Sequence, residues 1–381
     1  MKNNRTFLEK LLDGAEVEWK PLIKVASLTR GRVISKEYLA DNLGDYPVYS
    51  SQTVNNGEIG KINSFDFDGE FVSWTTDGAN AGTVFYRSGK FSITNVCGLI
   101  KIQNNLELNY KFLFYWLSIE AKNHVYSGMG NPKLMSHQME KILIPIPPLS
   151  VQTEIVRILD ALTALTSELT SELTLRQKQY EYYREKLLSH NDSESSSQQK
   201  VDKDKLFSTS NIQWLHLNEI YKFQYGIGNK IPTIGGEYPV YGSNGIVGSH
   251  NEYNSEDAPV IGHIGAYAGI VNWAEGKHFV TYNGIICNKI NDNVNSRYAY
   301  YLLLSQNFID KANKASQPFI SYDILNKCIV PVPPIEEQQR IVSILDKFET
   351  LTNSISEGLP LAIEQSQKRY EYYREVLLNF S

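Results

Sequence analysis

Residues 144–160 read IPIPPLSVQTEIVRILD, and residues 330–346 read VPVPPIEEQQRIVSILD. A second shared stretch follows each of them, QKQYEYYREKLL at 177–188 and QKRYEYYREVLL at 367–378. The period of roughly 190 residues is far longer than the roughly 20–50 residues of a solenoid repeat. The sequence therefore predicts two whole domains, each followed by its own helix.

The segments that precede these helices also correspond, although more faintly. Tyr46-Pro-Val-Tyr-Ser50 matches Tyr238-Pro-Val-Tyr-Gly242, and Gly78-Ala-Asn-Ala-Gly82 matches Gly265-Ala-Tyr-Ala-Gly269. Between these anchors the two halves differ freely. A shared skeleton with divergent loops is the pattern expected of two modules that bind different things.

Composition is that of an ordinary soluble protein. The 381 residues suit two domains with connecting helices, and 42% of them are hydrophobic and 21% charged. No stretch approaches the roughly 18 apolar residues of a membrane span, and the first residues do not resemble a signal peptide. The three cysteines, Cys97, Cys287 and Cys328, lie in apolar runs. We interpret them as buried thiols rather than metal ligands, which predicts a cytoplasmic protein.

The charge of the chain is unfavourable for DNA binding by this protein alone. The net charge is −5; residues 1–150 carry 16 Lys and Arg against 15 Asp and Glu, and residues 212–334 carry 8 against 9. Neither domain is strongly basic. If the chain binds DNA, we expect a partner to neutralise most of the phosphates.

Several secondary-structure elements are predicted by local patterns. Strands are expected within 71–74, 83–86 and 97–102, and helices at 110–117 and 298–304. The aromatic residues of these two helices favour the core, and a platform for stacking nucleotide bases is the alternative.

The two proline-rich runs mark the ends of the domains. Pro-x-Pro-Pro at 145–148 and at 331–334 cannot continue a strand or a helix, so each run is expected to end its domain. The helix that follows the first run carries leucines at spacings of three, four and four, which predict a coiled-coil seam. The helix after the second run breaks at Gly358-Leu-Pro360, and one long helix facing one interrupted helix suits an antiparallel pair.

Motifs for covalent chemistry are missing from the sequence. No Gly-Lys is followed by Ser or Thr, so there is no P-loop, and no Pro is followed by Asp, as a common nuclease pattern requires. The Pro-Pro pairs are not preceded by the Asn or Asp of an aminomethyltransferase motif. The seven histidines show no metal-ligand spacing. We therefore expect no catalytic residue and no metal site in this chain.

The doubled motif resembles that of the specificity (S) subunits of type I restriction–modification enzymes. It consists of Pro-x-Pro-Pro-[Leu/Ile], then Gln, then Ile-Val-x-Ile-Leu-Asp, leading to Gln-Lys-x-Tyr-Glu-Tyr-Tyr-Arg. The resemblance covers essentially the whole chain. It implies an α/β (α+β) fold with two target-recognition domains, separated by two long helices that form an antiparallel coiled coil with pseudo-two-fold symmetry.

The resemblance also implies a division of the chain into five parts. These are target-recognition domain 1 at 1–148, a central helix at 149–189, a linker at 190–210, target-recognition domain 2 at 211–334 and a C-terminal helix at 335–381. Each domain is expected to read one half of an asymmetric, two-part target in double-stranded DNA. No membrane contact is expected.

Partner subunits are implied to carry the chemistry. Two methyltransferase (M) subunits would bind S-adenosylmethionine and methylate adenine, and two restriction (R) subunits would use ATP and Mg²⁺. This chain itself would hold no cofactor. The helix residues expected to form the pair or to contact partners are Leu162, Leu165, Leu169, Leu173, Tyr180, Tyr183, Ile341, Leu345, Phe348, Tyr370 and Tyr373.

Candidate DNA contacts are the polar and aromatic residues of the divergent loops, because base readout needs hydrogen-bonding groups on exposed, well-held loops. The alternative for each is a role as a turn residue only. The candidates in the first domain are Ser50, Ser51, Gln52, Asn55, Thr75, Thr76, Asn80, Asn131 and Lys133. Those in the second domain are Lys230, Ser243, Asn244, His263, Tyr267 and Gln317.

Two other classes of protein remain to be distinguished. An interaction scaffold would use the same coiled coil without DNA specificity, and a gel shift with the M subunit discriminates it. A single-chain restriction–methylation enzyme would need the nuclease and methyltransferase motifs that the sequence lacks.

The tandem repeat Thr166-Ser-Glu-Leu169, Thr170-Ser-Glu-Leu173 predicts how the two half-sites are spaced. Adding one such unit lengthens a helix by about 6 Å, at about 1.5 Å per residue, and nearly preserves the leucine seam. Since a base pair rises about 3.4 Å, we expect the half-sites to move apart by one or two base pairs with unchanged sequences. Mapping methylated adenines for the insertion variant measures this. An active variant with the original spacer would mean that the repeat is only a helix surface.

Overall fold

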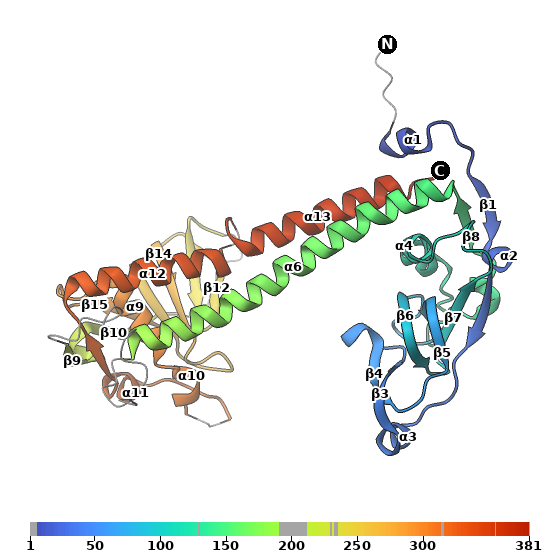
Figure 1. The fold of residues 1–381 in the computed structure, drawn as a ribbon. Coiled ribbons are helices and arrows are strands. Elements are labelled where there is room, and N and C mark those ends of the chain that lie inside the picture. The colour runs from blue at the N-terminus through green and yellow to red at the C-terminus, as the bar shows by residue number, and fades with distance from the viewer. Residues whose placement is uncertain are drawn as a thin grey trace, which may run out of the picture. The chain divides into compact units, whose positions relative to one another are not determined.

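The computed structural model describes residues 6–128, 130–189, 212–228, 231, 235–313, 316–354 and 356–380. The chain divides into two compact units, residues 1–169 with 363–381 (unit 1) and residues 170–362 (unit 2). Each unit therefore combines a globular part with segments of long helix (Figure 1). The predicted linker at 190–210 lies outside the described residues.

Unit 1 contains a six-stranded sheet of order β2-β7-β5-β6-β3-β4 and a two-stranded sheet of β1 and β8. β3 pairs in parallel with β6, and the other pairs are antiparallel. The strands are β1 (Glu18–Pro21), β2 (Ala26–Arg30), β3 (Leu43–Tyr49), β4 (Glu58–Ile62), β5 (Phe67–Thr75), β6 (Val84–Ile93), β7 (Cys97–Ile102) and β8 (Leu143–Ile146). The short helices are α1 (Phe7–Leu12), α2 (Leu22–Val25), α3 (Lys36–Asp41), α4 (Tyr110–Glu120), α5 (Ser136–Met139) and the 3₁₀ turns η1 (Val54–Gly57) and η2 (Ala121–His124).

Unit 2 repeats this topology strand for strand, in the order β10-β15-β13-β14-β11-β12 with a separate pair of β9 and β16. Its strands are β9 (Gln213–His216), β10 (Tyr221–Tyr225), β11 (Tyr238–Gly242), β12 (Gly245–His250), β13 (Ser255–Gly262), β14 (Val271–Val280), β15 (Gly284–Lys289) and β16 (Ile329–Val332). Its short helices are α8 (Leu217–Ile220), α9 (Ser296–Ser305), α10 (Phe308–Lys311) and α11 (Tyr322–Asn326). The internal repeat of the sequence is thus a repeat of the fold, and the strands predicted at 71–74, 83–86 and 97–102 lie in β5, β6 and β7.

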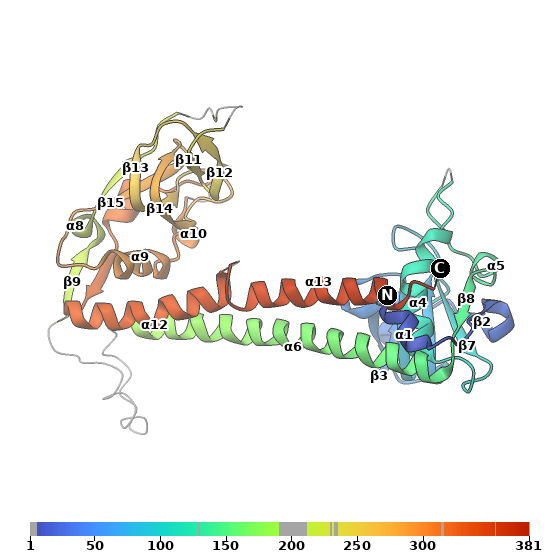
Figure 2. The same ribbon diagram turned by 90° about the horizontal axis from the view of Figure 1, so that it is seen from above.

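The predicted aromatic helices are α4 and α9, and both begin at an asparagine cap. The Asn109 side chain accepts hydrogen bonds from two backbone N–H groups of the first turn of α4, and Asn295 does the same for α9. α9 lies between β14 and α12 (Figure 2), and its Tyr298 and Tyr301 are fully buried. The choice of the core over a base-stacking platform is therefore confirmed.

The long helices are α6 (Leu149–Leu188), α12 (Ile335–Asn353) and α13 (Leu359–Leu377). The predicted break is present, since Gly358 has a φ of +84° between α12 and α13, a conformation that glycine tolerates best. α6 runs antiparallel to α13 in unit 1, where the hydroxyls of Thr166 and Ser366 are 2.8 Å apart. In unit 2 it runs antiparallel to α12, where Tyr183 stacks on Phe348.

The leucine seam of α6 is unevenly covered. Leu162, Leu169 and Leu173 are partly buried, whereas the Leu165 side chain is 39% exposed. Deeper packing occurs at the ends of the pairs, where Ile341 and Leu345 of α12 are fully buried. Among the described residues no helix is long and apolar enough to span a membrane.

The expectation that Pro-x-Pro-Pro cannot belong to a strand was wrong for its first proline. Pro145 lies in β8 opposite Trp19, and Pro331 lies in β16 opposite Trp214. Each belongs to a sheet of only two strands, so the missing N–H can face the side without a partner strand. The following Pro-Pro pairs do end the globular parts, because α6 and α12 start directly after them.

A buried glutamine fastens each long helix to its globule. Gln152 accepts a hydrogen bond from the Asn109 N–H (2.9 Å) and donates to the carbonyls of Glu107 (2.8 Å) and Pro147 (2.9 Å). Gln338 repeats the set, with the Asn295 N–H at 2.7 Å and the carbonyls of Asn293 and Pro333 at 3.2 and 2.8 Å. The glutamine of the repeated motif is therefore a structural connector.

The aspartate that closes each Ile-Val-x-Ile-Leu-Asp motif makes a second connection. Asp160 accepts a hydrogen bond from the Tyr115 hydroxyl at 2.7 Å and pairs with Lys111, both on α4. In unit 2, Asp346 accepts hydrogen bonds from Tyr301 at 2.6 Å and from Arg297 at 3.0 Å, both on α9. Burial and this carboxylate contact raise the pKa of Tyr115, so the phenol remains a donor at neutral pH.

We expect Gln152→Leu to destabilise unit 1. The substitution leaves one N–H and two carbonyls at this buried position without their partner, and each such group costs about 1–3 kcal/mol. Thermal or urea unfolding of the purified chain measures the loss. The control is Gln177→Leu, an exposed glutamine of the same helix, which should leave the midpoint within experimental error. Equal midpoints for the two variants would contradict the connector role.

Candidate nucleic-acid interface

Three loops of unit 1 meet at one end of its six-stranded sheet. They connect β3 to β4 (50–57), β5 to β6 (76–83) and the end of η2 to α5 (125–135). The Gly78 N–H donates to the Pro132 carbonyl at 3.0 Å, and the Leu134 N–H donates to the Thr76 carbonyl at 2.9 Å. The Asn80 side chain donates to the Ser51 carbonyl at 3.1 Å. The candidate residues of the first domain are therefore neighbours in space.

The corresponding loops of unit 2 meet in the same way. The Gly265 N–H donates to the Pro318 carbonyl, and the Ile320 N–H donates to the His263 carbonyl, both at 2.9 Å. Gly262 lies so close to the loop between β11 and β12 that a Cβ there would be 2.5 Å from the Ser243 carbonyl oxygen. These contacts bring together the five loop candidates Ser243, Asn244, His263, Tyr267 and Gln317. Lys230, another candidate, lies outside the described residues.

Exposure divides the candidates into three groups. The exposed ones, which can meet a ligand without rearrangement, are Asn55, Asn131, Lys133, Asn244, Tyr267 and Gln317. The partly buried ones are Ser50, Ser51, Gln52, Asn80 and Ser243. The buried ones are Thr75, Thr76 and His263.

The buried threonines use their hydroxyl groups within the protein. Thr75 donates to the Asn80 carbonyl. Thr76 donates to an Asp77 carboxylate oxygen at 2.7 Å and accepts from Arg30 at 3.1 Å. In this conformation both hydroxyls support the loop, and a direct contact with a base would require the side chains to turn outward.

The tip of the loop between β3 and β4 is shaped by two asparagines. Asn55 and Asn56 have φ of +51° and +53°, a left-handed conformation that asparagine tolerates better than most residues. The Gln52 side chain donates to the Glu58 carbonyl at 2.5 Å and so closes the loop. The Asn55 side chain is consequently exposed on a loop with a defined backbone, as readout of bases requires.

A buried arginine lies beneath this loop. The Arg87 guanidinium is 3.6 Å from the centre of the Tyr49 ring and 4.4 Å from that of Phe85, and Nε donates to the Ser73 hydroxyl at 3.1 Å. Burial lowers its pKa to about 10, so it stays charged at neutral pH. Because Arg87 is only 2% exposed, we assign it a supporting role rather than a contact with DNA.

Sequence reasoning missed a charged group next to the candidates of unit 1. Arg30, at the end of β2, donates from Nη2 to the Asn95 carbonyl at 2.7 Å and lies 3.8 Å from the Asp77 carboxylate. The other Asp77 oxygen is 3.8 Å from Nζ of the predicted residue Lys133. Arg30 is about 46 residues from Thr76 along the chain, and its neighbours in sequence show no motif, so only the fold reveals the group.

Aromatic rings occupy the comparable region of unit 2. The Tyr225 ring stacks on Tyr322, with centroids 4.2 Å apart and 14° between the planes, and lies 4.4 Å from the His263 ring. Tyr282 completes the group, with its ring 5.1 Å from His263. Burial is the main cause that raises the pKa values of Tyr225 and Tyr322, so both phenols are neutral under physiological conditions.

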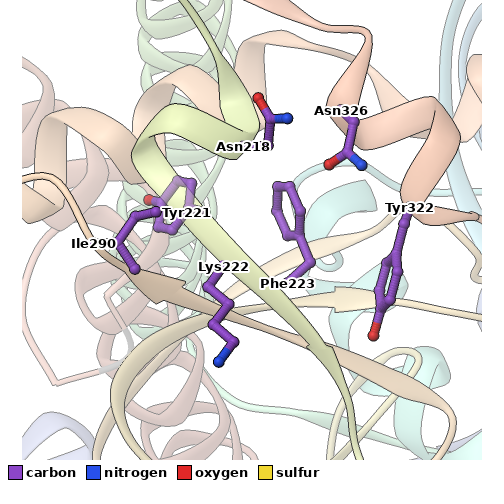
Figure 3. A pocket seen from close by; sticks show the side chains of 7 residues that line it. All are labelled: Asn218, Tyr221, Lys222, Phe223, Ile290, Tyr322 and Asn326. Carbon is purple, nitrogen blue, oxygen red and sulfur yellow. The ribbon is translucent and has the colours of Figure 1, made fainter.

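A pocket of about 320 Å³ lies against the edge strand β10, next to this aromatic group. Figure 3 shows the Phe223 and Tyr322 rings at its sides, with the amides of Asn218 and Asn326 above them. The remaining lining residues are Tyr221, Lys222 and Ile290. Across the described parts of the chain, no three His, Cys, Asp or Glu residues are grouped as metal ligands would be.

Comparison with known proteins gives a consistent result. The family model "Type I restriction modification DNA specificity domain" matches residues 16–179 and 217–365. A putative type I restriction enzyme specificity subunit of Haemophilus influenzae is 40% identical over the full length of both chains. The specificity subunit of an Escherichia coli type I restriction enzyme is 33% identical, over 98% of this chain and 97% of that one.

Solved structures show the same fold. The S subunit of a type I restriction–modification system from M. genitalium aligns with a TM-score of 0.65 at 19% identity, over 99% of this chain and 96% of that one. The match to the family model covers most of the chain, and the Haemophilus relative is similar from end to end. This chain belongs to the family of type I restriction–modification DNA specificity subunits.

Proposed function

We propose that each unit reads one half of an asymmetric, two-part target in double-stranded DNA and that the chain positions methyltransferase and restriction subunits on it. The observation that carries this is the pair of equivalent loop clusters. Both units hold their loops by the same backbone hydrogen bonds, yet the side chains on those loops differ. Equivalent frames with different side chains suit two readers of different sequences. Nothing in the geometry favours the alternative of a scaffold without DNA specificity.

The residues proposed to contact bases are the exposed candidates of the two loop clusters. In unit 1 these are Asn55, Asn131 and Lys133, and in unit 2 they are Asn244, Tyr267 and Gln317. Their amide, amino and hydroxyl groups supply the donors and acceptors that major-groove readout needs. The partly buried serines and amides, Ser50, Ser51, Gln52, Asn80 and Ser243, are proposed to add contacts or to hold the loops.

Partner subunits are proposed to carry the chemistry. Two M subunits would dock on the helices and supply S-adenosylmethionine, and two R subunits would supply ATP and Mg²⁺. The described residues support this division, because the helices keep apolar side chains such as Leu165 and Tyr182 exposed, at 39% and 56%. Cytoplasmic action is also proposed, and the three free, buried cysteines are compatible with a reducing compartment.

Exchange of residues 16–143 for those of a relative tests the two-reader arrangement. We expect one half of the methylated target to change and the other half to stay the same, because the exchanged residues include the loops of unit 1 alone. Sequencing of methylated adenines in a host that carries the hybrid and its M partner gives the result. If both halves changed together, independent reading by the two units would be refuted.

The chain alone should bind DNA weakly. Residues 1–150 and 212–334 have net charges of only +1 and −1, so they release few counterions from the phosphate backbone. We expect specific, tight binding to appear only when the M subunit is added, in gel shifts at physiological salt. A duplex with a scrambled target serves as the control. Nanomolar specific binding by the purified chain would contradict this prediction.

A further inference from the structure

Arg30 at the end of β2 and Tyr225 at the end of β10 are each followed by a glycine, Gly31 and Gly226. The Gly31 N–H donates to the Cys97 carbonyl at 3.2 Å, and the Gly226 N–H donates to the Gly284 carbonyl at 2.9 Å. A Cβ on either glycine would lie within 2.6 Å of the backbone of the strand end opposite, at 93–94 or 280–281. Both glycines are thus required by the same close approach. Arg30 and Tyr225, which precede them, occupy equivalent places.

The partners of these two residues are equivalent as well. The backbone bond from Leu134 to Thr76 in unit 1 recurs from Ile320 to His263 in unit 2, at 2.9 Å in both. Thr76 and His263 are the direct neighbours of Arg30 and Tyr225. The same backbone frame therefore carries an arginine–threonine contact in one unit and a tyrosine–histidine contact in the other.

In unit 1 this place is charged and accessible. The side chains of Arg30, Asp77 and Lys133 are 34%, 31% and 52% exposed, and the carboxylate stands 3.8 Å from each cation. Nη2 makes both hydrogen bonds that link Arg30 to described residues, to Thr76 and to the Asn95 carbonyl. Nε and Nη1 make no hydrogen bond to described residues. Either pair of parallel donors on the guanidinium also includes Nη2, so a bound base would take the place of one of the two bonds that Nη2 makes.

The hydrogen bonds from Arg30 to Thr76 and to the Asn95 carbonyl support the loop, but the ion pairs with Asp77 add little to stability. Partly exposed ion pairs contribute about 0–1 kcal/mol, and distances of 3.8 Å are long for such pairs. Unit 2 closes the same loops with the same backbone bonds and places aromatic rings instead of the charges. The loops thus assemble without these charges, which leaves recognition as the function that distinguishes the two sets of side chains.

We propose that Arg30 reads a guanine in the half-site of unit 1, with Asp77 as the residue that positions its guanidinium. Arginine is the side chain best suited to guanine, since its fork of donors matches the O6 and N7 acceptors in the major groove. The equivalent place in unit 2, with Tyr225 and His263, offers ring faces and edges and therefore a different preference. This inference rests on the proposed function, because it assigns one base contact within the target.

The test uses the complex of the full chain with its M subunit and maps methylated adenines on the host chromosome. The half-site of unit 1, assigned by the exchange of residues 16–143, should contain a G·C pair. Arg30→Ala should reduce the preference for that pair by about 10- to 100-fold, the range of one bidentate contact, and leave the other positions unchanged. Arg30→Gln should shift the preference at that position toward adenine, because the glutamine amide matches adenine.

Arg32→Ala is the matched control. Arg32 lies two residues further along and is also partly exposed, but its Nε is held by Asp66 at 2.9 Å. We expect the complex that carries Arg32→Ala to methylate the same DNA target as the wild type. Asp77→Asn should weaken the preference for the same base pair as Arg30→Ala and leave the other positions unchanged. Loss of a merely structural carboxylate would not have this effect. Thermal unfolding of each complex identifies a variant that fails to fold. If Arg30→Ala fails to fold, the base preference of Arg30→Gln, which keeps hydrogen-bond donors, decides whether the inference holds.

Three outcomes overturn the inference while leaving the proposed function intact. One is a wild-type half-site of unit 1 without a G·C pair. The second is an unchanged base preference in folded Arg30→Ala and Arg30→Gln, and the third is an equal loss of methylation at all targets in these variants. If the wild-type complex methylated no two-part target at all, the proposed function itself would fail.

Discussion

The rest of each unit depends on one glutamine side chain buried at the start of a long helix. An amide offers one acceptor oxygen and two N–H donors, and Gln152 and Gln338 each use all three on backbone groups. Glutamate would lose both donors, and an aliphatic side chain would lose every bond. The aspartate eight residues later lies about two turns along the same face, since a helix turns every 3.6 residues or so. Glutamine and aspartate thus fix where the helix starts and in which direction it leaves the globule.

The loops of each unit are held in a way that permits their side chains to change. The bonds that join the loop of residues 76–83 to that of residues 125–135 are bonds between backbone groups, and unit 2 repeats them. Such bonds tolerate almost any side chain. The positions of Arg30 and Lys133 in unit 1 can therefore be occupied by Tyr225 and Phe319 in unit 2 while the backbone frame is kept. Glycines 31 and 226 are fixed for the opposite reason, because a Cβ at either would collide with backbone atoms. The same backbone frame thus carries two different sets of side chains in the two units.

Much of the fold could be predicted from the sequence because the repeat samples each element twice. The two proline-rich motifs, the aromatic helices and the break at Gly358 are local patterns, and the structure contains all of them. Burial at the loops was not predictable. Thr76 lies on a loop, yet its side chain points inward and contacts Arg30, which belongs to a strand distant in sequence. The strand at Pro145 was not predicted for a related reason. Its place in a strand depends on a two-stranded sheet formed with β1, more than one hundred residues away.

Unit 1 is assembled from the two ends of the chain, which has a consequence for the order of folding during synthesis. Its core cluster contains Leu22 and Trp74 but also Leu377 and Leu378. Residues 363–381 leave the ribosome only after the whole of unit 2, which at roughly 5–20 residues per second takes some tens of seconds. During that interval the first domain to be translated has an uncovered apolar surface, while the second already holds all of its own segments. The unit that is translated first is therefore completed last.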